Sequence, residues 1–195
     1  MLFRSRGYRA TGFPAGCWTV TEGTLKTVPS KGGKECDIIT RRKYRDFELT
    51  LEWKVGSGGN SGILYRAAEL PRPDPIWHSA PELQILDDSA HPTATPQTLT
   101  GSLYDLVAPV DKVVRPIGEW NEAGVVVKGD HVEHWLNGRK VLEYELGSAD
   151  FKARIAASKF KDMPRFAVEK EGHIGLQHHG EEAWFRNIRI RELSR

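Results

Sequence analysis

The stretch Phe47-Glu48-Leu49-Thr50-Leu51-Glu52-Trp53 alternates apolar and polar residues without a break. Side chains of a β-strand point alternately to its two faces, so this period of two predicts a strand with one buried and one outer face. The predicted core face carries Phe47, Leu49, Leu51 and Trp53, and the outer face carries Glu48, Thr50 and Glu52.

Segments with strand character continue on both sides of residues 47–53. Asn137-Gly138 separates two of them, and this dipeptide is the strongest short signal for a type I′ hairpin turn. One short helix is expected within residues 148–160. The other expected strands cover residues 63–66, 82–87, 124–128, 131–136, 141–146, 174–178 and 184–190.

Strands that recur about every 8–12 residues with turn residues between them predict an all-β sandwich or barrel rather than βαβ units. A chain of 195 residues lies in the range that one all-β domain fills, so residues 1–195 are interpreted as a single domain. The residues on alternating apolar faces are expected to form the core: Phe47, Leu49, Leu51, Trp53, Ile63, Leu83, Ile85, Val125, Val127, Ile174, Leu176 and Ile188.

The charge of the chain is nearly balanced, with 28 Lys and Arg against 26 Asp and Glu. A dedicated nucleic-acid binder would carry a concentrated basic face, so no nucleic-acid partner is expected. No apolar run of about 18 residues occurs, and no membrane-spanning helix is expected. The first residues lack the apolar stretch and cleavage site of a secretory signal, so either the protein is cytoplasmic or this chain begins after a removed leader.

The two cysteines, Cys17 and Cys36, fit no metal-binding pattern, because the chain has no Cys-x-x-Cys and no Cys/His pair at ligand spacing. A disulfide between them is open on sequence grounds. The pair His178-His179 also resembles metal ligands, but adjacent strand residues face opposite ways and cannot both bind one ion. No metal and no other cofactor are therefore expected.

Several predicted strands carry polar residues on the face opposite to the core. If these strands lie in one sheet, that face combines carboxylates, a guanidinium, amides and an imidazole, which suit hydroxyl-rich ligands and acid–base chemistry. Outward strand residues are usually only solvated, but amides and a histidine are unusual where a plain surface would carry Lys, Thr and Glu. Loops 67–81 and 88–102 are long enough to be functional. The expected outer set is Glu52, Arg66, Glu82, Gln84, Gln177 and His179.

Short motifs along almost the whole chain resemble one known family. They include Gly59-Asn60-Ser61-Gly62-Ile63, Glu82-Leu83-Gln84-Ile85-Leu86-Asp87 and Gly175-Leu176-Gln177-His178-His179-Gly180, with further matches at residues 44–49, 101–104, 118–121, 135–138 and 185–188. Together they resemble the 3-keto-disaccharide hydrolase domain family. The resemblance implies a concanavalin A-like jelly-roll sandwich of two antiparallel sheets. It also implies a bacterial periplasmic or secreted setting and substrates that are glycosides oxidised to a ketone at C3.

The chemistry of such substrates assigns roles to the outer set. A ketone at C3 acidifies the C2 proton, and loss of that proton lets the C1 leaving group depart by β-elimination before water adds back. Glu82 or His179 is expected to be the base and the other to protonate the leaving group, with Arg66 stabilising the enolate. Substrate contacts are expected from Asn60, Gln84, Tyr104, Trp120, Gln177 and Glu52.

Two other functions are considered beside this one. A conventional retaining glucanase needs a pair of carboxyl groups, whereas the neighbour of Glu82 on its face is Gln84, which disfavours that chemistry. A non-catalytic, lectin-like carbohydrate-binding module on the same fold is the main alternative. Each of these three functions implies an oligosaccharide or glycoside as the binding partner. The sequence leaves the oligomeric state open.

Overall fold

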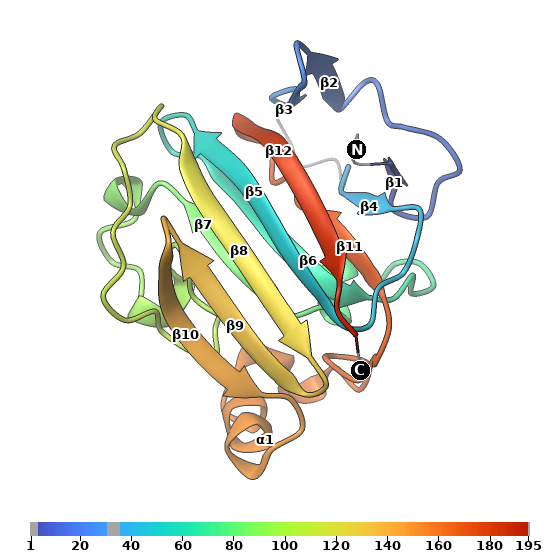
Figure 1. Cartoon of the computed structure of the whole chain (residues 1–195), viewed down its shortest axis with the longest axis vertical. Helices are drawn as coiled ribbons and strands as arrows, with labels where there is room; N and C mark the ends of the chain where they lie inside the picture. The colour runs from blue at the N-terminus through green and yellow to red at the C-terminus, as the bar shows by residue number, and fades with distance from the viewer. Residues whose placement is uncertain (1–3, 31–35, 195) are drawn as a thin grey trace.

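The computed structural model describes residues 4–30 and 36–194. Two antiparallel sheets pack face to face, and Figure 1 shows the five-stranded sheet behind the seven-stranded one. The five-stranded sheet has the order β1 (Ser5–Gly7), β4 (Ile38–Thr40), β11 (His173–Leu176), β6 (Asn60–Ala67) and β7 (Glu82–Leu86). The seven-stranded sheet has the order β10 (Arg139–Glu145), β9 (His131–Leu136), β8 (Asn121–Lys128), β5 (Phe47–Val55), β12 (Ala183–Glu192), β3 (Thr24–Thr27) and β2 (Trp18–Thr21).

Helical segments are short and lie outside the two sheets. The helix α1 (Ala149–Ala156) begins at Ser148, whose hydroxyl accepts from the Phe151 N–H, and it lies within the predicted 148–160. Four 3-10 turns complete the structure: η1 (Ile76–His78), η2 (Asp88–Ala90), η3 (Pro96–Thr98) and η4 (Lys159–Asp162). None of the helices in the described parts of the chain is long and apolar enough to cross a bilayer.

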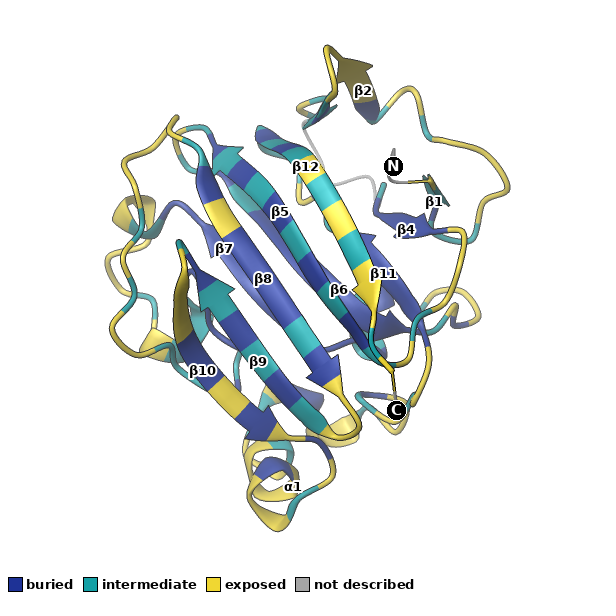
Figure 2. Ribbon diagram, viewed as in Figure 1, coloured by how far each residue is buried: buried dark blue, intermediate teal, exposed yellow. Residues whose placement is uncertain are grey.

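The inner faces of both sheets form one apolar core, as the alternating pattern predicts. Figure 2 shows the alternation along β5, where every second residue is buried. Eleven of the twelve predicted core residues are buried, and Ile188 is half-buried. The exception has a backbone cause: the register of β12 shifts between Arg186 and Arg189, and Asn187 has a φ of 53°. The all-β jelly-roll prediction is confirmed.

The two cysteines left open by the sequence form a disulfide. Cys17 and Cys36 are 19 residues apart in the chain and their Cα atoms lie 5.9 Å apart. The indole N–H of Trp18, the next residue, donates to the Cys36 carbonyl at 2.6 Å.

Candidate functional site

A polar pocket of about 190 Å³ lies on the outer face of the five-stranded sheet. Its floor comes from the three strands β11, β6 and β7, which are neighbours in that order. Gly62 pairs with Gln84, and the Gln177 N–H donates to the Gly62 carbonyl at 3.0 Å, so the three strands are locked in register here. The floor residues are Asn60, Glu82, Gln84 and, just beyond β11, Gln177 and His179.

One wall of the pocket is Trp77, which the long loop between β6 and β7 holds against the sheet. The neighbouring Ile76 is fully buried in a small apolar cluster with Ile39 and Leu64 on the outer sheet face. A β-carbon at Gly175 would lie only 2.8 Å from Cδ1 of Ile76, so the absence of a side chain there lets the loop sit close to β11. The prediction that loop 67–81 is functional fits this placement.

The opposite wall is made by Tyr104 and Lys159. Residues 101–104 run beside β7, where the Tyr104 N–H donates to the Glu82 carbonyl at 3.0 Å. The Lys159 N–H donates to Asp105 Oδ2 at 2.9 Å, which ties η4 to the same segment. The Lys159 ammonium then lies 4.2 Å from the ring centroid of Tyr104 and 4.5 Å from that of Trp77.

Glu82 is the one carboxyl group among the described residues that line this pocket. Its side chain is buried and its Oε1 has no hydrogen-bond partner in the described structure. Burial raises the pKa of Glu82 to about 8, although the nearby Lys159 cation opposes the shift. At neutral pH the carboxyl group is therefore mostly protonated and can donate a proton into the pocket.

The histidine pair divides between the two faces as the strand pattern predicts. His178 is buried, its Nε2 lies 3.0 Å from the Val28 carbonyl, and its ring meets Trp18 edge-on. His179 is exposed and lines the pocket, with its Nδ1 2.9 Å from Glu181 Oε2.

The expectation that Arg66 lies in the groove is wrong. Arg66 has a φ of 50° near a register shift between β6 and β11. Its side chain therefore does not point to the face that regular strand alternation predicts. Its buried guanidinium donates to the carbonyls of Arg45 and Gly129, at 3.1 and 2.6 Å, and lies 3.7 Å from Asp46. Desolvation lowers the pKa of this arginine. Arg66 is therefore committed to internal contacts.

The expectation that Glu52 and Trp120 share the pocket is also wrong, because Glu52 lies in β5 of the seven-stranded sheet and Trp120 directly precedes β8 of that sheet. Glu52 belongs to β5 and accepts from Arg186 at 2.7 Å and from Asn187 at 2.5 Å. These two hydrogen bonds lower the pKa of Glu52. The Arg186 guanidinium also covers the Trp120 ring, 4.0 Å from its centroid.

Of the nine predicted site residues, the structure brings six together around one pocket: Asn60, Glu82, Gln84, Tyr104, Gln177 and His179. Sequence reasoning missed Trp77 and Lys159. The length of loop 67–81 pointed towards Trp77, whereas Lys159 follows a helix and carries no periodic signal.

Comparisons of the amino-acid sequence with a family and with a relative show the family of this chain. The family described as the 3-keto-alpha-glucoside-1,2-lyase-like domain matches residues 5–191. A 3-keto-disaccharide hydrolase of Bacteroides thetaiotaomicron is 39% identical over 215 residues, which cover 96% of this chain and 74% of that protein. The chain belongs to this family. As a member of the 3-keto-alpha-glucoside-1,2-lyase-like family, it is a carbohydrate-active enzyme that acts on glycosides.

Solved structures agree with the assignment to the 3-keto-alpha-glucoside-1,2-lyase-like family. A candidate glycosyl hydrolase of Parabacteroides distasonis is 31% identical, covers 97% of this chain and 88% of its own, and superposes with a TM-score of 0.89. The carbohydrate-binding module CBM66 of Bacillus subtilis is 14% identical, with 98% and 97% of the two chains covered and a TM-score of 0.59. At that identity CBM66 supports the fold alone.

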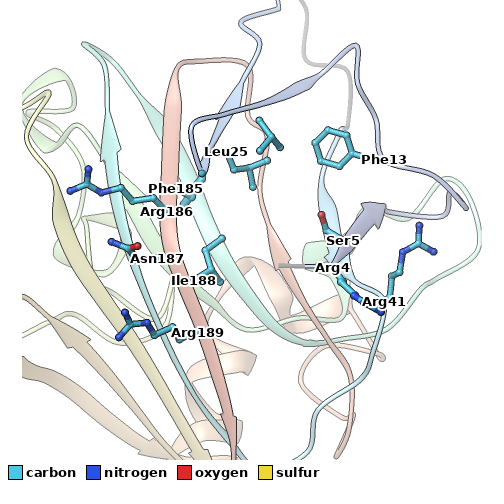
Figure 3. Close-up of a pocket in the computed structure, with 12 residues that line it drawn as sticks. Arg4, Ser5, Phe13, Leu25, Arg41, Phe185, Arg186, Asn187, Ile188 and Arg189 are labelled. Atoms are coloured by element: carbon cyan, nitrogen blue, oxygen red, sulfur yellow. The ribbon is translucent and has the colours of Figure 1, made fainter. Parts of the chain in front are cut away.

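A larger cavity of this 3-keto-alpha-glucoside-1,2-lyase-like domain, about 560 Å³, lies between β12 and the N-terminal segment (Figure 3). Phe13, Leu25 and Ile188 line its apolar part, and Arg4 and Arg41 lie on the far side. Its described lining contains no carboxyl and no imidazole group, so it lacks the groups that proton transfer requires.

A candidate metal-binding group lies elsewhere, on the outer side of β9 and β10. One ligand atom from each of His131, Glu133 and Glu143 lies within 4.8 Å of the others. The Lys140 ammonium already pairs with both carboxylates, 3.2 Å from Glu133 and 2.5 Å from Glu143. This cluster is on the other sheet from the polar pocket, and Lys140 already supplies a cation to both of its carboxylates.

Proposed function

We propose that the pocket around Glu82 cleaves glycosides that carry a ketone at C3, by C2 proton abstraction, β-elimination and hydration. The observation that carries this proposal is the Glu82 carboxyl group, buried, unpaired at Oε1 and facing a pocket with an imidazole at its rim. Such a group holds a proton at neutral pH and can release it to a leaving group in the pocket.

His179 is the base in this proposal. Its Nδ1 faces the Glu181 carboxylate at 2.9 Å, and an ionised carboxylate only accepts hydrogen bonds. Nδ1 therefore carries the ring proton, which leaves Nε2 free to accept a proton from the substrate. Glu181 orients His179 in the way that a third group orients the base in other acid–base sites.

The two groups exchange roles between the two half-reactions. In elimination His179 takes the C2 proton, the C1–O bond breaks, and Glu82 protonates the departing oxygen. In hydration the Glu82 carboxylate takes a proton from water as its oxygen adds to C1, and protonated His179 returns a proton to C2. Both groups end in their starting states, so the cycle is closed.

The remaining floor residues supply specificity for a sugar. Asn60, Gln84 and Gln177 carry amide groups, each of which donates and accepts hydrogen bonds and so matches sugar hydroxyls. Trp77 and Tyr104 add flat apolar surfaces on the walls. A conventional glycosidase needs two carboxyl groups roughly 5–10 Å apart, and the described pocket lining offers Glu82 alone.

The deciding experiment compares a 3-keto-disaccharide with its unoxidised parent. We expect turnover of the oxidised sugar and none of the parent, because only the ketone acidifies the C2 proton. Cleavage of the parent alone would refute the proposal. Saturable binding of either sugar without any turnover would favour a carbohydrate-binding module instead.

We also propose an extracytoplasmic location. The Cys17–Cys36 disulfide supports it, because disulfides persist in oxidising compartments and are rare in the cytosol. Fractionation of the native host with detection of the protein in the periplasm or medium tests this, and recovery in the cytosol would contradict it.

A further inference from the structure

Lys159 occupies the pocket without a counter-ion. No carboxylate oxygen among the described residues lies within ion-pair distance of its Nζ. Instead the ammonium is surrounded by the rings of Trp77, Tyr104 and Phe160, with centroids at 4.5, 4.2 and 5.2 Å. Aromatic faces stabilise a cation while leaving its N–H groups free to donate elsewhere.

The proposed elimination needs a group that stabilises negative charge on the C3 oxygen. When the C2 proton leaves, its electron pair moves towards the C3 oxygen, and the step is fast only if that charge is stabilised. Arg66 cannot supply the cation, because its guanidinium is bound to the carbonyls of Arg45 and Gly129. Among the described residues lining the pocket, Lys159 is the one lysine or arginine.

We infer that Lys159 is a catalytic residue of this site, whose ammonium binds the C3 carbonyl oxygen and stabilises the enolate formed there. The inference rests on the proposed function. In the balanced step, His179 takes the C2 proton, the electron pair passes to the C3 oxygen beside Lys159, and its return expels the C1 oxygen, which Glu82 protonates.

The environment of Lys159 favours this charge-based role over a covalent one. Burial lowers the pKa of its ammonium, which makes the ammonium a stronger hydrogen-bond donor than a solvated lysine but by itself also favours the neutral amine. The three surrounding rings favour the charged form, whereas a Schiff base with the ketone would need the neutral amine.

The test compares Lys159→Met and Lys159→Arg with a matched control, Lys161→Met, in the full chain. Lys161 is exposed, lies two residues away and is outside the pocket. On a 3-keto-disaccharide we expect Lys159→Met to lose about 10²–10³-fold in kcat, the usual effect of removing one oxyanion donor. Lys159→Arg should recover part of the rate, and Lys161→Met should match the unsubstituted enzyme.

Two further readouts separate a catalytic role from a structural one. In D2O, the deuterium exchange at C2 of recovered substrate should fall in Lys159→Met together with kcat, because enolate formation is the step affected. The alkaline limb of the pH–rate profile should also move to higher pH, because removal of the cation raises the pKa of Glu82 further.

The outcomes distinguish this inference from the proposed function. If the unsubstituted enzyme cleaves the 3-keto sugar and Lys159→Met retains its kcat and its exchange rate, the role of Lys159 is refuted and the proposed function stands. If a lysine–sugar adduct is trapped with borohydride on Lys159, the charge-based role is refuted in favour of a Schiff base. If the unsubstituted enzyme neither cleaves nor exchanges, the proposed function falls, and this role of Lys159 with it.

Discussion

The Glu82 side chain lies directly against Gly62 on the neighbouring strand. A β-carbon at residue 62 would be 2.7 Å from Cδ of Glu82 and 2.8 Å from its Cγ, closer than real β-carbons approach other atoms. The Glu82 carboxyl group therefore packs directly against the Gly62 backbone. The absence of a side chain at Gly62 is what allows the buried Glu82 carboxyl group to lie so close to β6.

Gly62→Ala is expected to displace the Glu82 carboxyl group and to lower kcat by about 10²-fold, since a shift of roughly 1 Å can cost this much. The strands themselves should survive, because alanine is compatible with an extended backbone. Steady-state kinetics and circular dichroism check both parts. Gly12→Ala is the control, since a β-carbon there meets nothing within 4 Å. Full activity in Gly62→Ala would show that the position of Glu82 is not critical.

Glu82→Gln is expected to remove turnover and to change how stability depends on pH. The folded-state pKa of Glu82 is raised to about 8 from an ordinary 4.5, so between these values the folded protein binds the proton and the unfolded chain does not. The free energy of unfolding should therefore fall as pH rises through this window, by about 1.4 kcal/mol per pH unit from this group.

Denaturant unfolding of both proteins from pH 5 to pH 9 measures the effect. The amide of Glu82→Gln does not ionise, so the variant should match the unsubstituted protein near pH 5 and exceed its stability near pH 9. Parallel curves over the whole range would mean that Glu82 has an ordinary pKa, and its assignment as the proton donor would then fail.

The alternation of apolar and polar residues was sufficient to predict the strands and the core, but not the sheet to which each strand belongs. Strands β5 and β6 follow each other in the chain, yet β5 lies in the seven-stranded sheet and β6 in the five-stranded one. The outward face of β5 therefore points to the opposite side of the molecule. For this reason the grouping of Glu52 with Glu82 is wrong. Gln84 lies in β7 and Gln177 directly follows β11 of the same sheet, so both line the pocket with Glu82.

The remaining differences arise where the backbone leaves the regular period. Arg66 follows the strand pattern in sequence, but its positive φ turns the side chain towards Arg45 and Gly129. Trp77 and Lys159 reach the pocket through contacts between distant segments, such as Ile76 over Gly175. Local sequence patterns carry no information about such contacts. The length of loop 67–81 indicated the segment that holds Trp77 but not the residue, and Lys159 could be found only in the structure.

Arg66→Met is expected to destabilise the protein and to leave catalysis nearly unchanged. The substitution removes a buried guanidinium that donates to two carbonyls, and losing such charged hydrogen bonds costs about 2–4 kcal/mol. Below the melting transition, kcat should stay within about twofold, because the side chain does not line the pocket.

Thermal unfolding and kinetics on the same preparation of Arg66→Met check this expectation. Arg42→Met serves as the control, because Arg42 forms an exposed pair with Glu192 and such pairs contribute little. A large loss of kcat at unchanged stability would return Arg66 to the mechanism as the enolate stabiliser.

His178→Ala and His179→Ala are expected to have opposite effects, although the two residues are adjacent. His178 is buried, with Nε2 at 3.0 Å from the Val28 carbonyl and its ring against Trp18, so its loss leaves a cavity and an unpaired carbonyl. It should lower the melting temperature, by an amount corresponding to about 2–4 kcal/mol, and keep kcat. His179 is exposed and touches Glu181, so its loss should keep the melting temperature and lower kcat by about 10²–10⁴-fold, as expected for a general base. If His178→Ala lost activity at full stability while His179→Ala remained active, His179 would not be the base. The group that takes the C2 proton would then lie on the face of the sheet to which His178 points.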